Sequence, residues 1–132
     1  MNSKIGDFIR FSLAANSTDI VTPLTSGWMS ASDARQYAGV LMASVLANTK
    51  HVTVQLRQAT NSSGAGAKNL GAAVIHTATG AETNVVVVAE ARAEDIDTAN
   101  GFGYVAVTVS SDNSAAVPAT ALLLKSSNRF NP

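Results

Sequence analysis

The fold is decided by His51–Ala59, HVTVQLRQA, which runs directly into Thr60–Gly71, TNSSGAGAKNLG. Side chains of a β-strand point alternately to opposite faces. In the first segment one face is apolar (Val52, Val54 and Leu56), and the residues between are polar. This period of two predicts a strand with one face in a core and the other in solvent. The Gly, Ala, Ser and Asn that follow predict a long loop.

Similar segments recur along the chain and predict further strands. Asn84–Arg92 is so rich in valine that we expect it to be covered on both faces. Pro118, near the start of the last segment, indicates an edge position or a bulge. The remaining strands are expected in the second half of Lys4–Leu13, at Gly27–Ser30, Gln36–Leu46, Leu70–Ala78, Phe102–Ser110 and Ala115–Lys125.

One of these segments is also compatible with a helix. Ser32 and Asp33 could cap a helix over Ala34–Leu46. We favour a strand, because Gly39 weakens a helix and the valines of this segment favour β-structure. About eight strands at roughly 8–12-residue spacing then predict an all-β antiparallel sandwich, for which a jelly roll is the favoured topology.

Composition limits the possible functions. The 132 residues fit one domain spanning 1–132, with a possible contact arm and first strand at 1–13 and a tail at 126–132. Formal net charge is zero and only 14% of residues are charged, which argues against a nucleic-acid partner. A neutral lone domain and a subunit covered by neighbours both fit this composition. With no cysteine, disulfides and thiolate sites are excluded.

Nothing in the chain indicates a membrane segment. Met1–Arg10 lacks the apolar stretch of a signal peptide, and the apolar run Gly39–Leu46 is too short to span a bilayer. We therefore expect a soluble protein made in the cytoplasm.

No motif points firmly to chemistry. Gly64–Gly71 is rich in glycine, but Lys68 is not followed by the Ser or Thr and the helix of a phosphate-binding loop, so a flexible contact loop is preferred.

An acidic cluster at Glu90, Glu94, Asp95 and Asp97 could bind a cation. We prefer a solvated bend that is anchored by Ile96 and partly neutralised by Arg92. No set of residues supplies nucleophile, base and orienting group together, so we predict no enzyme and no cofactor.

The histidines and the aromatic residues also give no firm indication of a catalytic or ligand-binding site. His51 and His76 lack a partner at zinc or triad spacing and are expected to face solvent. Trp28 and Tyr37 could form a platform on which a sugar stacks. We prefer the interpretation that the aromatic residues Trp28, Phe102 and Tyr104 anchor the core or an interface.

The chain resembles small bacteriophage capsid decoration, or cement, proteins. The residues that carry the resemblance cover a little over a third of the chain: Val52–Gly71, Ala91–Gly101, Phe102–Val109 and Ser127–Pro132, with Tyr37, Gly39 and Val40. The resemblance implies a sandwich, often a homotrimer, on the surface of a virion. It also implies the major capsid protein as partner, host cytoplasm as the place of synthesis, and no nucleic acid or membrane partner.

The resemblance implies that copies of the protein bind across seams between capsid subunits and stabilise the shell through many simultaneous contacts. The expected capsid-facing arm is Asn2–Phe11 or the Ser62–Asn69 loop. Candidate capsid or protomer contacts are Ile5, Phe8, Arg10, Trp28, Lys68, Asn69 and Phe130, the last as a tail anchor. The alternatives are a receptor- or glycan-binding sandwich on a virion fibre, and a tail-tube or head–tail joining protein.

Overall fold

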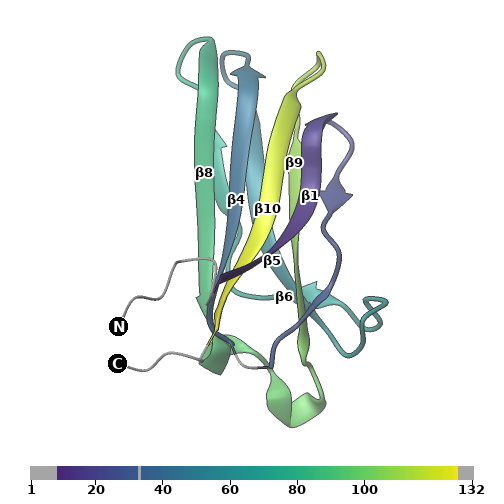
Figure 1. The fold of residues 1–132 in the computed structure, drawn as a ribbon. Coiled ribbons are helices and arrows are strands. Elements are labelled where there is room, and N and C mark those ends of the chain that lie inside the picture. Colours follow the sequence, from purple (N-terminus) through teal and green to yellow (C-terminus); the bar gives the residue numbers. More distant parts are fainter. Residues whose placement is uncertain (1–8, 33, 128–132) are drawn as a thin grey trace, which may run out of the picture.

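The protein folds as two antiparallel β-sheets packed face to face (Figure 1). The structure is a computed structural model that describes residues 9–32 and 34–127. The long strands are β1 (Ile9–Asp19), β4 (Ala34–Leu46), β5 (His51–Ala59), β8 (Glu82–Arg92), β9 (Tyr104–Ser111) and β10 (Pro118–Ser127). Short strands are β2 (Leu24–Thr25), β3 (Met29–Ser30), β6 (Lys68–Asn69) and β7 (Val74–Thr77). Single 3-10 turns, η2 (Ala93–Asp95) and η3 (Thr98–Asn100), join β8 to β9.

The strand order is that of a jelly roll. One sheet has the order β1-β10-β4-β8, and in the other β9 pairs with β2, β3 and β5, while β5 also pairs with β6 and β7. If β2 with β3, and β6 with β7, are each taken as one interrupted strand, eight strands remain in two layers. The predicted all-β sandwich of about eight strands is confirmed. In the part of the chain described here, no helix is long and apolar enough to cross a membrane.

The segment that was compatible with a helix is the strand β4. It spans Ala34–Leu46 and lies between β10 and β8 in the four-stranded sheet. At its centre the two sheets approach closely: a Cβ atom added to Gly39 would lie 2.5 Å from Cγ2 of Val107 and 3.2 Å from Cγ1 of Val54. The glycine that weakens a helix is therefore required by sheet packing.

Two expectations about single strands are corrected by the structure. Pro118 does not lie on an edge strand, because β10 pairs with β1 on one side and β4 on the other. The alternative expectation, a bulge, is met close by, since β1 has a register shift between Ala15 and Thr18, opposite Ala121 and Ala119. As the first residue of β10, Pro118 occupies one of the places where a strand tolerates proline. The valine-rich strand β8 is covered on one face only: Val85 and Val87 are buried, whereas Val86 and Val88 are exposed.

Asp19 ties the end of β1 to two other backbone segments. Its Oδ1 accepts hydrogen bonds from the Val117 amide at 2.9 Å and the Val21 amide at 3.1 Å. These bonds favour the ionised carboxylate, so the pKa of Asp19 is lowered, first by the bond from Val117. The ionised form of Asp19 thus holds the loop before β10 against the end of β1.

Replacing Gly39 tests the close approach of the sheets. We expect Gly39→Ala to lower the free energy of unfolding by about 1–3 kcal/mol, because the added methyl overpacks the core. Gly103→Ala is the matched control, since nothing lies within 4 Å of its added Cβ. Urea unfolding of both variants measures the effect, and a Gly39→Ala protein as stable as the wild type would contradict this packing.

The Asp19 contacts predict how stability depends on pH. Because the folded pKa of Asp19 lies below its ordinary value of 3.8, the stabilisation is present above that value and is lost as the pH falls through the folded pKa. The pKa values of Glu82, Asp97 and Asp112 are lowered too, so these groups act in the same direction. We expect urea midpoints to fall between pH 5 and pH 2, and to fall less steeply in Asp19→Asn. Glu94→Gln, at a largely exposed carboxylate, serves as the control.

Candidate interaction surface

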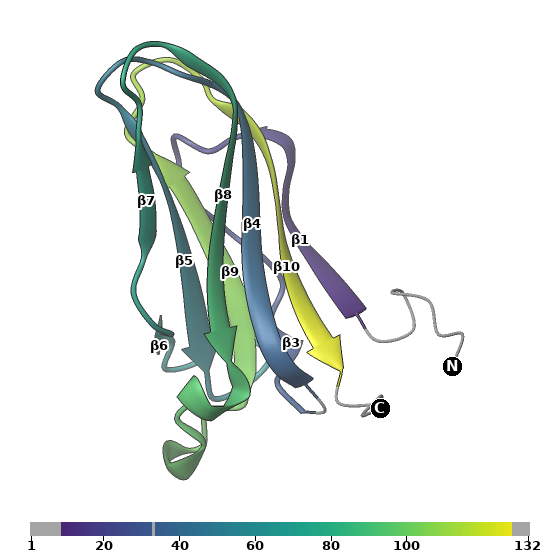
Figure 2. The same cartoon turned by 90° about the vertical axis from the view of Figure 1, so that its left-hand side faces the viewer.

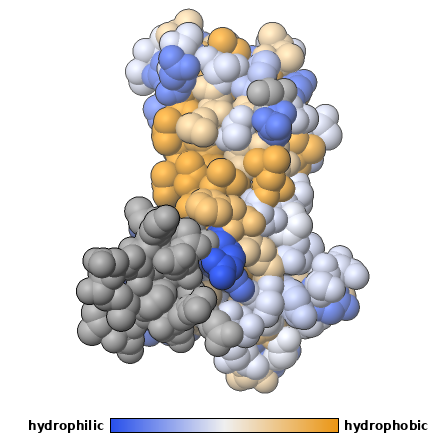
Figure 3. Space-filling view, viewed as in Figure 1, coloured by the Kyte–Doolittle hydropathy of each residue, from blue (hydrophilic) through white to orange (hydrophobic). Residues whose placement is uncertain are grey.

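The outward face of the four-stranded sheet is apolar over most of its width. Every strand of this sheet contributes outward-pointing apolar side chains, several of them well exposed: Val86 is 61% and Phe11 58% exposed. We call this surface the outer apolar face; it consists of Phe11, Leu13, Val40, Met42, Val86, Val88, Leu122 and Leu124. Figure 3 shows hydrophobic residues gathered over the middle of this side of the molecule.

Strand register places these side chains in rows across the sheet. One row runs over all four strands, because Leu13 pairs with Leu122, Leu122 with Val40, and Val40 with Val88. The neighbouring rows contain the pairs Phe11–Leu124 and Met42–Val86. Side chains paired directly across strands are in contact distance of one another. The rows therefore form a continuous apolar surface.

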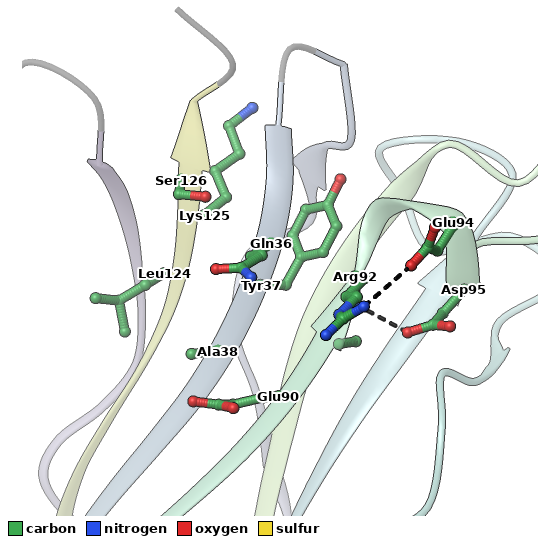
Figure 4. A pocket seen from close by; sticks show the side chains of 11 residues that line it. Gln36, Tyr37, Ala38, Glu90, Arg92, Glu94, Asp95, Leu124, Lys125 and Ser126 are labelled. Atoms are coloured by element: carbon green, nitrogen blue, oxygen red, sulfur yellow. Dashed lines mark hydrogen bonds and ion pairs between the residues drawn. The ribbon is translucent and has the colours of Figure 1, made fainter. Parts of the chain in front are cut away.

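Polar groups border this surface at both ends. At the end near η2 a hollow of about 600 Å³ is lined by Gln36, Glu90, Arg92 and Lys125 among others (Figure 4). At the other end a hollow of about 250 Å³ has Ser44, Asn84 and Thr120 in its wall. An apolar centre with a polar rim is the usual composition of a protein–protein interface.

Arg92 and its neighbours shape the charged end. The Arg92 guanidinium lies 3.5 Å from Glu94 Oε1, measured from Nη1, and the Arg92 amide donates to Asp95 Oδ2 at 2.9 Å. These contacts connect the end of β8 to η2. Positive and negative groups are therefore interleaved at this end, with Glu90 beside them in the hollow (Figure 4).

The four candidate contact residues that the structure describes are spread over both sheets. Lys68 and Asn69 form β6 at an edge of the other sheet, and Arg10 is an exposed residue of β1. Trp28 is half-buried against the long loop, where a Cβ atom added to Gly64 would lie 2.6 Å from its Nε1. The other three candidates lie outside the described residues: Ile5, Phe8 and Phe130.

The Lys68 ammonium already has interaction partners within the protein. Its Nζ lies 2.6 Å from Asp97 Oδ2 and 4.3 Å from the centroid of the Phe102 ring. The bond from Lys68, followed by one from Asn100, lowers the pKa of Asp97. The long loop is thereby attached to the connection between β8 and β9. A partner that recruits the Lys68 ammonium must compete with Asp97.

The acidic cluster behaves as a bend of the chain. Asp97 is held by Lys68 and Asn100, and Asp95 accepts from the Arg92 amide. The predicted anchor of this bend, Ile96, is buried. Among the residues that the structure describes, no three acidic or histidine side chains are grouped as metal ligands would be.

Both histidines are partly exposed and each is paired with a carboxylate. His51 Nδ1 lies 3.2 Å from Asp112, and His76 Nε2 lies 2.6 Å from Glu82. The second pair joins β7 to the start of β8, and so connects the two sheets. The bond from His76 lowers the pKa of Glu82. The sequence indicated exposure of the histidines but not these partners.

Tyr37 does not form a sugar-stacking platform with Trp28. It is a core residue, 2% exposed, and its hydroxyl donates to the Ala31 carbonyl at 2.9 Å. Burial raises the pKa of Tyr37 to about 12. A ring enclosed in this way has no free face for a carbohydrate, so the platform envisaged for a glycan-binding module is wrong at Tyr37.

The sequence does not reveal the outer apolar face, because in several strands the inward-pointing and the outward-pointing residues are both apolar. Val85 and Val87 point inward while Val86 and Val88 point outward, and Leu123 is buried between the outward-pointing Leu122 and Leu124. Such a run predicts a strand with two apolar faces. It does not indicate whether each of these faces is covered by the same chain or by another protein.

Comparison with solved structures supports the fold assignment. The fold is similar to that of a chain in the structure of infectious bursal disease virus, Gx strain, with 9% identity over 94% of this chain and a TM-score of 0.58. It is also similar to VP2 of the same virus in its subviral particle, with 10% identity over 91% of this chain and a TM-score of 0.57. This chain spans about a third of each, 33% and 32% respectively. No family model and no curated protein matches the sequence.

Adjacent residues of β4 distinguish the core from the outer apolar face. Leu41 is 0% exposed and Met42 is 47% exposed. We expect Leu41→Ala to cost about 2–5 kcal/mol of folding free energy through the cavity it leaves. Met42→Ala should cost about 1 kcal/mol or less, since little surface is lost from the core. Equal costs in urea unfolding would mean that Met42 is also covered within the monomer.

Proposed function

We propose that this chain is a structural protein of a virion that binds the surface of an assembled capsid and stabilises it. The observation that carries the proposal is the outer apolar face, which contains eight apolar side chains, five of them exposed and three half-buried. Exposed apolar patches of this kind mark binding surfaces in soluble proteins. The jelly-roll sandwich, similar in fold to VP2 in its subviral particle, agrees with this role.

The size of the face favours repeated weak contacts over one strong contact. The face is four strands wide and three rows long, about five residues along each strand. With strands about 4.8 Å apart and about 3.3 Å per residue, its footprint is near 19 Å by 17 Å, or roughly 300 Å². A stable interface takes about 800 Å² from each partner. One copy alone would therefore bind modestly, and simultaneous binding of several copies across subunit seams would supply the remaining affinity.

The surrounding chemistry supports binding and not catalysis. In the described part of the chain the histidines are each held by a carboxylate, and Asp97 is held by Lys68. The larger hollow combines both charges at the rim of an apolar surface. We infer a non-enzymatic role, with the major capsid protein as partner and the capsid surface as location.

We also propose the further features that the resemblance implies. They comprise the homotrimer, the capsid-facing arm at Asn2–Phe11 or Ser62–Asn69, and the contact residues Ile5, Phe8, Arg10, Trp28, Lys68, Asn69 and Phe130. Removal of residues 2–10 tests the arm separately from the outer apolar face. Capsid binding that is unchanged by this deletion would dismiss the arm at Asn2–Phe11 and leave the Ser62–Asn69 loop and the outer apolar face as candidate contacts.

Capsid binding can be tested with one charged substitution on the outer apolar face. Met42→Lys places a charge among Val86, Thr120 and their neighbours, so we expect at least a tenfold loss of co-sedimentation with empty capsids of the encoding virus. Thr53→Lys is the matched control, because Thr53 is a half-buried strand residue of the other sheet.

Circular dichroism and urea unfolding should first establish that both variants fold. Wild-type protein that does not co-sediment with these capsids at micromolar concentration would contradict the proposed function. Equal loss of binding in Thr53→Lys and Met42→Lys would contradict the assignment of binding to the outer apolar face.

A further inference from the structure

β8 is an outermost strand of the four-stranded sheet and has one side open. It pairs with β4, and in the described chain no strand pairs with its other side. Figure 2 looks at the molecule from the side on which β8 lies, and β8 runs along the margin of its sheet there. Alternate backbone amides and carbonyls of an edge strand point outward and are available to another strand.

The two edges of this sheet differ in how well they are protected. β1, at the opposite edge, has register shifts between Leu13 and Ala15 and between Ala15 and Thr18. Such irregularities hinder pairing with another chain. β8 is 11 residues long, and its central Val85–Ala89 segment contains no proline, lysine or other charged residue. Of the two, β8 is the edge suited to pairing.

We propose that β8 pairs antiparallel with β8 of a second copy of this chain, with Val87 opposite Val87 on the two-fold axis. Val87 is the midpoint of β8, so this register uses the whole strand. It places Val86 opposite Val88 of the partner subunit and Val85 opposite Ala89 of the partner subunit. Apolar side chains thus meet apolar side chains on both faces of the joined sheet.

The charges at the ends of β8 favour this register over its neighbours. With Val87 on the axis, Glu82 lies opposite the Arg92 of the other copy. If Val86 were on the axis, Glu82 would lie opposite Glu90, and like charges directly across a strand pair repel. If Val88 were on the axis, Val86 would lie opposite Glu90, which removes an apolar pair.

The centre of the strand supplies the pairing, and its ends select the register. Glu82 already binds His76, and Asn84 has a left-handed backbone with φ of 54°, which turns the start of β8 away from regular strand geometry. Arg92 likewise has Glu94 nearby. The expected ladder therefore covers Val85–Ala89 most regularly, while opposite charges at the ends disfavour slipped registers.

Pairing at this edge would also enlarge the outer apolar face. Val86 and Val88 lie on that face, next to the open edge. Joining two copies edge to edge places their apolar faces side by side, with a combined footprint of roughly 600 Å² by the same strand spacings. The inference stands independently of capsid binding. A two-fold contact gives dimers, or hexamers where trimers are joined.

Single cysteines test the register directly, because the chain contains none of its own. Residues opposite each other on antiparallel strands have Cα atoms about 4.5–5.5 Å apart, within the range of a disulfide. We expect a mixture of Val86→Cys and Val88→Cys, one carrying an affinity tag, to form a mixed disulfide dimer under mild oxidation. Its yield should be at least fivefold above that of either variant alone.

The control mixes Val88→Cys with Leu13→Cys, an equally exposed position on the other edge strand. Light scattering of wild-type protein without capsids should give the mass of a dimer or hexamer. A monomer or a lone trimer at high micromolar concentration would overturn the inference, as would a mixed disulfide no more abundant than in the control. Because no capsid is present, failure here leaves the proposed capsid binding untouched.

Discussion

The close approach of the two sheets at Gly39 is the constraint on which the rest of the structure depends. With Val107 and Val54 facing it, this position has no room for a side chain. The core beside it is built largely from alanine and valine, and small, stiff side chains allow sheets to pack closely. In the absence of disulfides, this tight layer must supply most of the stability.

A core completed in this way leaves the outer apolar face without a role in folding. Its residues lie on the side of the sheet that points away from the sandwich, and most of them are exposed. Exposed apolar surface favours association, and the low charge of the chain does little to oppose it. Such a surface is explained when another protein covers it, which is why we assign it to binding and not to stability.

The sequence predicts the architecture well and the interaction surface poorly, for one physical reason. Alternation at His51–Ala59 identifies β5 because its two faces differ, and valines with a central glycine correctly favour a strand at β4. In β8 both faces are valine, so alternation cannot tell a buried layer from an exposed one. Tyr37 and Pro118 are similar cases: burial and the order of strands depend on partners distant in sequence.

The two sheets differ in polarity, and this difference orients the molecule. Thr53, Gln55 and Arg57 are the residues of β5 that point away from the core, whereas the corresponding positions of β4 and β8 are largely apolar. The more polar sheet also carries exposed apolar side chains, Val74 and Ile75, on β7 at its edge. A protein whose two broad sides differ in polarity binds a surface in one orientation. The open edge of β8 belongs to the apolar sheet, so pairing there extends the binding side sideways without covering it. Self-association and attachment to a larger assembly can therefore occur together.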